Sequence, residues 1–306
     1  MKAWLILHKK AVILAAAALV VLGTAVGLLV GRGYRTIQIY ELVGEAALTR
    51  EGEQLTPYVN MQLKSGDRAE TFADSFLYLR MDNDKYMLAE PETVFSLEAS
   101  GSPRSSRTQI HLEAGAVVNH ITRPLSAASS YVVTTPNSTM AVRGTSFRVY
   151  VWYDAAGLSH TLLQVFEGVV EVHLLYPDGR IGEEGRLFRA GETASIWGSS
   201  EDADYDEETT GIDYYKLEIR TLEFLKIGIG QPVTGYDVTD SEVDEIIKLK
   251  QTVFQVRFIV GGQVFGTQSV LFDHTASPPL LTPAAGGAWD FDFDTPIRAD
   301  TDIPWA

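Results

Sequence analysis

The chain contains no cysteine among its 306 residues. This absence excludes thiol catalysis and argues against a secreted scaffold held together by disulfide bonds. It fits either a reducing cytosol or a cell envelope without disulfide-forming machinery. Other catalytic signatures are missing too, because there is no G-x-S-x-G nucleophile turn and no glycine-rich phosphate loop. The sequence therefore predicts a protein that is not an enzyme and has no cofactor.

Metal-binding patterns are weak as well. The six histidines are scattered without the close spacing of zinc ligands. Asp202 to Asp206 has the alternating oxygen ligands of a calcium loop, but such loops carry glycine at the sixth position, where this chain has Glu207. Glu167 and Glu171 flank Gly168 and would share one strand face only if no bulge intervened. We predict no metal site and no catalytic residue.

Basic residues are scarce relative to acidic ones. The chain carries 40 Asp and Glu against 25 Lys and Arg, for a net charge of −15. The first 35 residues hold five of the bases and no acid, so residues 36–306 carry a net charge of −20. Because a surface this negative is repelled by nucleic acid and by anionic lipid, we predict no nucleic-acid partner.

One segment, Ala11 to Gly31, has no charge and follows Lys9 and Lys10. As a helix it would be about 31 Å long, enough to cross a hydrocarbon core of about 30 Å. A cleaved signal peptide is the alternative, with Gly23-Thr24-Ala25 as the cleavage site, but the apolar stretch continues past it. The flanking charges predict a single-pass cell-membrane protein with a cytoplasmic N-terminus and extracytoplasmic C-terminal domains.

Short runs of alternating hydrophobicity follow, from Ile37 to Trp197, separated by turn signals. This pattern is typical of a sandwich or a solenoid-like β domain. Phe76 to Met81 and Lys85 to Leu88 flank Asp82-Asn83-Asp84, which predicts a β-hairpin. Ser100 to Ser106 is rich in serine and predicts a surface loop.

The most informative stretch runs from Tyr131 to Val151 and reads YVVTTPNSTMAVRGTSFRVYV. Pro136 cannot donate to a sheet ladder, so the first strand should end there or lie at an edge. Gly144 can adopt a positive φ, so the chain can bend sharply before the next strand. Arg143 precedes this bend, and we predict that its guanidinium braces the turn, since it can bond several carbonyls at once.

The order strand, Thr-Pro, strand, Arg-Gly-Thr-x-Phe, strand resembles the core motif of the FecR domain, an extracytoplasmic all-β module. Further segments in the same order extend the resemblance over residues 37–198: Ser65-Gly66-Asp67, Glu113-Ala114-Gly115, Phe166 to Val172 and Ala190-Gly191-Glu192. The residues predicted to form its structural motif are Pro136, Arg143, Gly144, Thr145, Phe147 and Gly168. In iron-citrate signalling, FecR proteins restrain a sigma factor with a cytoplasmic N-terminal segment, and ten residues before the apolar segment are too few for one.

The rest of the chain predicts three further parts. Gly198 to Asp213 has seven acids and no base, as in a solvated linker. Asp213 to Ile229 and Thr239 to Leu249 predict a helical hairpin, the second helix beginning with a Thr-x-x-Glu capping box. Residues 253–305 resemble the internalin-type B-repeat of bacterial surface proteins, with two strands, a Gly-Gly turn and a cluster around Trp289. That resemblance implies a small β-grasp-like module.

The predicted fold class is mainly β, with an N-terminal transmembrane helix, a β-sandwich or β-solenoid-like FecR domain, a short helical hairpin and a C-terminal β-grasp-like module. The predicted parts are a cytoplasmic tail (1–10), the transmembrane helix (11–31), the FecR-like domain (37–198), an acidic linker (199–212), the hairpin (213–250) and the B-repeat-like module (252–306).

The predicted function is that of a non-catalytic protein of the bacterial cell envelope. Its FecR-like domain would bind or scaffold a protein partner or a small extracellular ligand. Two alternatives remain open. One is transmembrane signalling together with a separate cytoplasmic regulator, since Gly23-x-x-x-Gly27 suits helix pairing. The other is surface adhesion or glycan binding, for which Trp152, Tyr153, Trp197, Trp289 and Trp305 could supply aromatic contacts.

Overall fold

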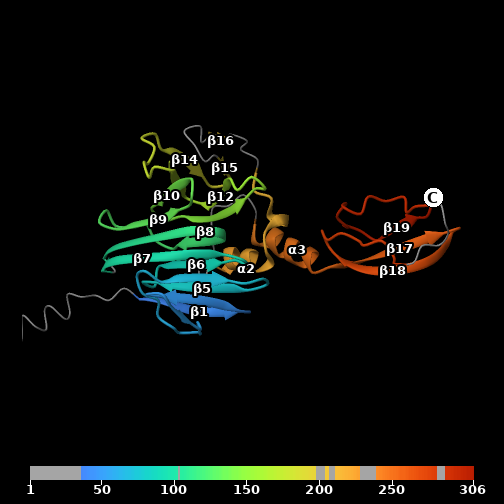
Figure 1. Cartoon of the computed structure of the whole chain (residues 1–306), viewed down its shortest axis with the longest axis horizontal. Helices are drawn as coiled ribbons and strands as arrows, with labels where there is room; N and C mark the ends of the chain where they lie inside the picture. Colours follow the sequence, from blue (N-terminus) through green and yellow to red (C-terminus); the bar gives the residue numbers. More distant parts are fainter. Residues whose placement is uncertain (1–35, 103, 198–203, 207–210, 228–238, 281–286) are drawn as a thin grey trace, which may run out of the picture. The chain divides into compact units, whose positions relative to one another are not determined.

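The computed structural model describes residues 36–102, 104–197, 204–206, 211–227, 239–280 and 287–306. The chain divides into two compact units, residues 1–210 and 211–306, called here the sandwich unit and the C-terminal unit. Strands predominate, in agreement with the predicted mainly β composition (Figure 1).

The sandwich unit consists of two β-sheets that share one long strand, β8 (Ser105–Ile121). Sheet A contains, in spatial order, β1 (Ile37–Val43), β5 (Phe76–Met81), β6 (Lys85–Ala89), the second half of β8, β11 (Ser146–Tyr153), β12 (Ser159–Glu167), β15 (Thr193–Trp197) and β16 (Asp204–Asp206). Sheet B contains β3 (Glu53–Leu55), β2 (Ala46–Arg50), β4 (Arg68–Thr71), β7 (Val94–Ser102), the first half of β8, β9 (Ser130–Thr134), β10 (Ser138–Val142), β13 (Val169–Leu174) and β14 (Arg186–Arg189). Neighbouring strands in these sheets are antiparallel except for β8 and β9, which are parallel.

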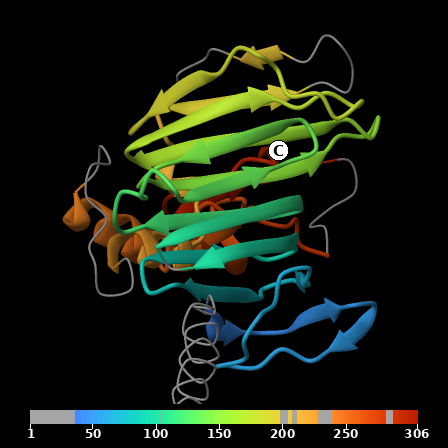
Figure 2. The ribbon, with the colours of Figure 1, turned by 90° about the vertical axis from the view of Figure 1, so that its left-hand side faces the viewer.

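In both sheets the spatial order of the strands follows their order in the chain, apart from the exchange of β2 and β3. The chain therefore advances from one end of the unit to the other while it alternates between the sheets. Figure 2 shows this progression as a run of colour from the blue strands through green to yellow. The unit has the two packed sheets of a sandwich, and its strands follow one another along the unit as in a solenoid. This architecture is compatible with the predicted sandwich or solenoid-like domain.

At most crossings from one sheet to the other the chain makes a tight corner that holds a residue with positive φ; the longer β8–β9 connection has none. In chain order these residues are Gly44, Asp74, Glu92, Gly115, Gly144, Gly168 and Gly191. Gly115 lies inside β8, which pairs with β7 before it and with β6 and β11 after it. Bends and bulges of this kind let one strand contribute to both layers of a sandwich.

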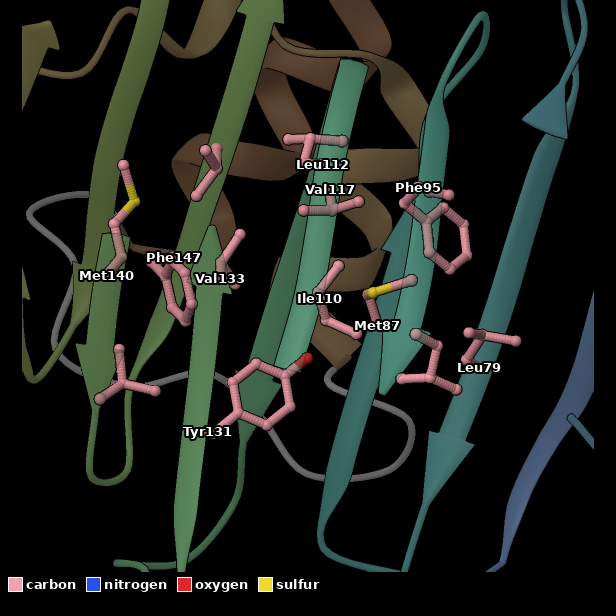
Figure 3. Packing of buried hydrophobic residues seen from close by; sticks show 14 of the residues in the cluster. Leu79, Met87, Phe95, Ile110, Leu112, Val117, Tyr131, Val133, Met140 and Phe147 are labelled. Atoms are coloured by element: carbon pink, nitrogen blue, oxygen red, sulfur yellow. The ribbon is translucent and has the colours of Figure 1, made fainter. Parts of the chain in front are cut away.

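The inward faces of the two sheets form one apolar core. Phe147 and Val117 extend from sheet A, and Phe95 and Val133 extend toward them from sheet B (Figure 3). All four side chains are fully buried. Complete burial of a side chain of this size stabilises the folded state by about 1.5–3 kcal/mol, so the alternation along each strand is the main determinant of this fold.

A buried polar cluster joins the two sheets beside the β9–β10 turn. The Asn137 side-chain amide donates to the carbonyls of Ser159 and Ile196, both at 3.1 Å. Its Oδ1 accepts from the hydroxyls of Thr161, at 2.7 Å, and Thr135, at 3.1 Å. Because every one of these contacts is buried, loss of the amide would leave unpaired polar groups in the interior.

The C-terminal unit begins with a short 3₁₀ helix, η1 (Tyr214–Lys216), and two α-helices, α2 (Ile219–Ile227) and α3 (Asp240–Lys250). The predicted first helix is therefore shorter than Asp213 to Ile229. The predicted capping box is confirmed, because the Thr239 hydroxyl accepts from the Glu242 amide and the Glu242 carboxylate accepts from the Thr239 amide.

A three-stranded sheet follows the helices in this unit. Its strands are β17 (Val253–Val260), β18 (Gln263–Leu271) and β19 (Thr301–Pro304), and β19 runs parallel to β17. The hairpin of β17 and β18 matches the two strands expected from the sequence. Phe258 is 2% exposed and packs edge-on against Trp289, with ring centroids 5.0 Å apart. The other buried members of this small core are Val256, Val270, Ala276, Ile297 and Ile303.

Two predictions are corrected by the structure. The serine-rich segment Ser100 to Ser106 is not a long surface loop, since its two ends belong to β7 and β8, which form a hairpin. The predicted transmembrane helix is not supported, because no helix in the described parts of the chain is long and apolar enough to cross a membrane. Residues 11–31, where that helix was predicted, lie outside the described residues. The predicted cell-membrane localisation and topology fail on the same finding.

Candidate functional site

The predicted motif residues Gly144, Thr145 and Gly168 lie together where two corners meet. Gly144 (φ +122°) turns the chain from β10 into β11, and Gly168 (φ +79°) turns it from β12 into β13. A β-carbon on Gly168 would lie 2.6 Å from the Gly144 carbonyl oxygen, so only glycine fits there. The Thr145 hydroxyl donates to the Val169 carbonyl at 3.1 Å. The two corners thus hold each other in register.

The same arrangement occurs at two earlier pairs of corners. At the first, Gly44 approaches Ser75, and the Ser75 hydroxyl accepts from the Glu45 amide at 2.9 Å. At the second, Gly115 approaches Thr93, whose hydroxyl accepts from the Ala116 amide at 2.9 Å. In each pair a hydroxyl on one corner bonds the residue after the glycine of the other. This repeated contact is called the corner clasp below.

The other motif residues, Pro136, Arg143 and Phe147, lie in three different environments. Phe147 is fully buried in the sandwich core. Pro136 is exposed in the turn between β9 and β10, so the first strand ends before it. Arg143 is exposed, and its carbonyl accepts from the Leu125 amide at 3.2 Å. Its guanidinium forms no hydrogen bond or ion pair with another described residue, and the turn-bracing role remains a prediction.

The outer face of sheet B carries mostly polar side chains and is called the open face. One cross-strand row consists of Arg68, Ser96, His111, Thr134, Thr139 and His173. The next row consists of Glu98, Gln109, Val132, Ala141 and Glu171. All eleven side chains are half-buried or exposed, whereas the residues that alternate with them point into the core. The face therefore presents small hydroxyl, amide and charged groups on a rigid sheet.

A shallow cavity of about 250 Å³ lies at one end of the open face. Glu98, Arg107 and Gln109 line it from β7 and β8, together with Ser65 and Ser130. Because a drug-sized ligand needs a pocket of about 300–1,000 Å³ that encloses most of its surface, this cavity is small for such a ligand. It suits a single side chain or a small polar group.

Each of the two histidines on the open face stands beside a carboxylate. His173 Nε2 lies 3.2 Å from Glu171 Oε1, and its Nδ1 lies 2.9 Å from the Gly182 carbonyl. His111 Nε2 lies 3.6 Å from Glu98 Oε1, too far for a good hydrogen bond. The two pairs are apart from each other, since His173 and Glu171 lie on β13 whereas His111 and Glu98 lie on β8 and β7. No group of three or more metal-ligating side chains occurs among the described residues.

One serine–histidine contact has the composition of a catalytic centre but the wrong geometry. His120 Nδ1 lies 2.5 Å from Ser146 Oγ, and Ser146 Oγ lies 3.5 Å from Glu167 Oε2. The acid therefore faces the serine, whereas a triad requires it to orient the histidine. Ser146 is fully buried and His120 is 3% exposed. Burial lowers the pKa of His120, so the imidazole is held neutral in a site that substrate cannot reach.

Glu167 and Glu171 do not share one strand face. Glu167 ends β12 in sheet A, and Glu171 lies on β13 in sheet B, because the Gly168 corner intervenes.

Aromatic rings on the neighbouring strands β11 and β12 stack on one another, on the side of sheet A that faces away from the core. Tyr150 and Trp152 have centroids 5.1 Å apart, and Trp152 and His160 are likewise 5.1 Å apart, with interplanar angles of 20° and 15°. The Arg148 guanidinium covers Tyr150 at 5.2 Å, and Asp154 bonds His160 at 3.2 Å. Sugar-binding aromatics need free ring faces, and here the ring faces are largely taken by neighbours.

Comparison with known proteins identifies the part of the chain that carries the motif. Residues 67–171 match the model of the FecR protein family. This FecR region confirms the resemblance seen in the sequence, over a shorter range than the predicted 37–198. It begins at Asp67 and ends at Glu171, so it contains β4 to β12 and the first part of β13. The internalin-type resemblance of residues 253–305 is not shown by the comparisons.

Two solved structures found by comparison are candidate anti-sigma factors from Parabacteroides distasonis ATCC 8503. One, at 2.50 Å resolution, has 13% identity and a TM-score of 0.38, with 52% of this chain and 64% of that chain covered. The other, at 1.65 Å, has 11% identity and a TM-score of 0.34, with 80% and 96% covered. The chain thus spans 64% of the length of the first of them. No curated protein matches the chain.

Sequence reasoning missed the open face entirely. Its residues are spread over six strands, from Arg68 to His173, and most are Ser, Thr, Gln and His, which carry no recognisable motif. The one available signal was the polar phase of the alternation in each strand, such as Thr134 and Thr139 on either side of Pro136. That signal locates an outer face but gives no indication of which strands will lie side by side.

Proposed function

We propose that the sandwich unit is a non-catalytic binding module with a signalling or regulatory role, and that its open face receives a protein partner. The observation that carries this proposal is a row of polar residues that crosses sheet B without a break from β4 to β13. A second row runs beside it from Glu98 on β7 to Glu171 on β13. The proposal rests on the shape and chemistry of this face.

The dimensions of the open face favour a protein over a small molecule. Strands in a sheet lie about 4.8 Å apart, so a row across six strands is about 24 Å wide. That width suits a standard protein interface, which buries about 800 Å² on each partner. The cavity of about 250 Å³ beside Glu98 can accept one side chain of such a partner.

The FecR region and the open face coincide. Ten of the eleven open-face residues lie within residues 67–171, and His173 follows two residues later. FecR proteins act in signalling, so the resemblance supports a regulatory role for this surface. The buried position of Ser146 and His120 supports a non-catalytic role, because a nucleophile must reach its substrate.

Site-specific photo-crosslinking tests the proposal. A photo-reactive amino acid is placed at Thr134 or Thr139 on the open face, in cells that naturally contain the protein, and at Ala156 in the exposed β11–β12 loop as a control. We expect both open-face positions to give the same protein adduct, identified by mass spectrometry, and the control to give none. Absence of an adduct at both open-face positions, or the same adduct at Ala156, contradicts the proposal.

A further inference from the structure

A groove of about 540 Å³ lies in the C-terminal unit between helix α3 and the segment just before and within η1. Its lining includes the apolar side chains of Ile212, Ile246 and Leu249, which are called the floor here. Ile246 and Leu249 are three residues apart on α3, so they lie on one face of the helix. This volume is large enough for one or two apolar side chains of an incoming peptide.

Acidic residues form the rim of the groove. Glu242 and Glu245 lie on the same helical face as Ile246, and Asp213 lies across the groove as the N-cap of η1. Glu245 is exposed and makes no hydrogen bond or ion pair with another described residue. A free carboxylate beside an apolar floor is complementary to a cationic group that also carries hydrocarbon, as arginine and lysine do.

The other two acids are held in place by local structure. Glu242 Oε2 accepts from the Thr239 amide and hydroxyl, both at 2.7 Å, and the backbone bond lowers the pKa of Glu242. Asp213 Oδ1 accepts from the Tyr215 amide at 3.1 Å. The rim charges are therefore anchored without being neutralised by these bonds.

Two lysines lie near the groove but outside its lining. Lys216 Nζ is 3.9 Å from Asp213 Oδ2, and the Lys216 side chain is 80% exposed. A surface pair at this distance contributes little and exchanges readily for another cation. Lys250 Nζ donates to the Tyr215 carbonyl at 2.8 Å, which fixes η1 against the end of α3. The three rim acids thus still outnumber the bases beside them.

We propose that this groove binds a short basic segment of a partner protein, with an apolar side chain on the floor and an arginine or lysine at the rim. The three carboxylates attract and orient the segment, and the floor supplies the apolar contact that the charges alone lack. The open face plays no part in this site.

Fluorescence anisotropy with synthetic peptides tests the proposal on the full chain. The probe is a short labelled peptide that repeats leucine and arginine. One comparison peptide replaces every arginine with glutamate, and a second replaces every leucine with serine. We expect saturable binding of the probe, weaker binding at high salt, and at least tenfold weaker binding of both comparison peptides, since each lacks one of the two complementary features.

The variant Glu245→Lys reverses a rim charge, and Glu223→Lys makes the same change on an exposed position of α2 that does not line the groove. We expect Glu245→Lys to weaken binding of the probe about tenfold and Glu223→Lys to leave it within about twofold. Circular dichroism verifies that both variants keep their helices. No saturable binding of the probe, or equal weakening by the two variants, overturns the proposal. Neither result bears on the open face, because the crosslinking experiment uses separate positions.

Discussion

The two units of the chain bury their apolar residues in different ways. The sandwich unit closes a broad core between two sheets, mostly with aliphatic side chains such as Val133 and Val149. The three-stranded sheet of the C-terminal unit has a small core of six buried side chains, and the partly buried rings of Trp289, Phe291 and Phe293 pack against it beside Phe258. A core between two sheets spreads its stabilisation over many contacts. A core of few side chains concentrates it, so single changes should have unequal effects on the two units.

Phe258→Ala should have the largest effect. The ring is 2% exposed and contacts Trp289 and Phe293, so its removal costs about 3–5 kcal/mol, a large part of the stability of a small unit. We expect β17 and β18 to lose protection in hydrogen-exchange mass spectrometry while β8 and β11 keep theirs. Retained protection of β17 would show that the aromatic cluster is less important than proposed here.

Phe147→Ala is the matching change in the sandwich unit. Its cost should also be about 3–5 kcal/mol, because the side chain is fully buried. The larger core should nevertheless remain folded, with a lower unfolding midpoint in denaturant and an unchanged m-value. If the sandwich unit were unfolded in water after this change, the comparison between a distributed and a concentrated core would fail.

Gly168→Ala tests the corner clasp. The substitution places a β-carbon 2.6 Å from the Gly144 carbonyl oxygen and also strains a backbone with φ +79°. Gly179→Ala is the matched control, because Gly179 has φ +83° and open space around it. We expect a loss of about 3 kcal/mol or more for Gly168→Ala and about 1–2 kcal/mol for the control, measured by chemical denaturation. Equal losses would mean that the close contact of the two corners contributes nothing.

The smallest expected effect is a pH dependence from His120. Burial lowers the pKa of His120 in the folded state, whereas the unfolded chain titrates near the ordinary value of about 6.5. Below about pH 6.5 the unfolded state therefore binds a proton that the folded state does not, and the free energy of unfolding falls as the pH falls. We expect His120→Gln to be less pH-dependent than the unsubstituted protein between about pH 7.5 and pH 5.5. Parallel curves for the two proteins would contradict this assignment.

Local features of the fold were accessible from the sequence. The hairpin around Asn83, the end of a strand before Pro136 and the capping box at Thr239 each depend on residues a few positions apart. Their physical causes are turn preference, the missing amide of proline and a short side-chain hydrogen bond, which act without the rest of the fold.

The arrangement of the sheets was not accessible in this way. Gly115 reads as an ordinary residue within a strand, yet it divides β8 between sheets A and B. The clasp partners Thr93 and Thr145 are common residue types, and their roles arise only when distant corners meet. The open face has the same origin, since cross-strand neighbours are set by long-range pairing that periodicity does not encode.

We propose above that the sandwich unit binds its partner on the open face. Ala141 lies within that face between Val132 and Glu171, whereas Ala156 is exposed in the β11–β12 loop of sheet A. The decisive measurement is the affinity of the crosslinked partner, by titration calorimetry, for Ala141→Arg and for Ala156→Arg. We expect at least tenfold weaker binding for Ala141→Arg and unchanged binding for Ala156→Arg. Equal affinities of the two folded variants would contradict it.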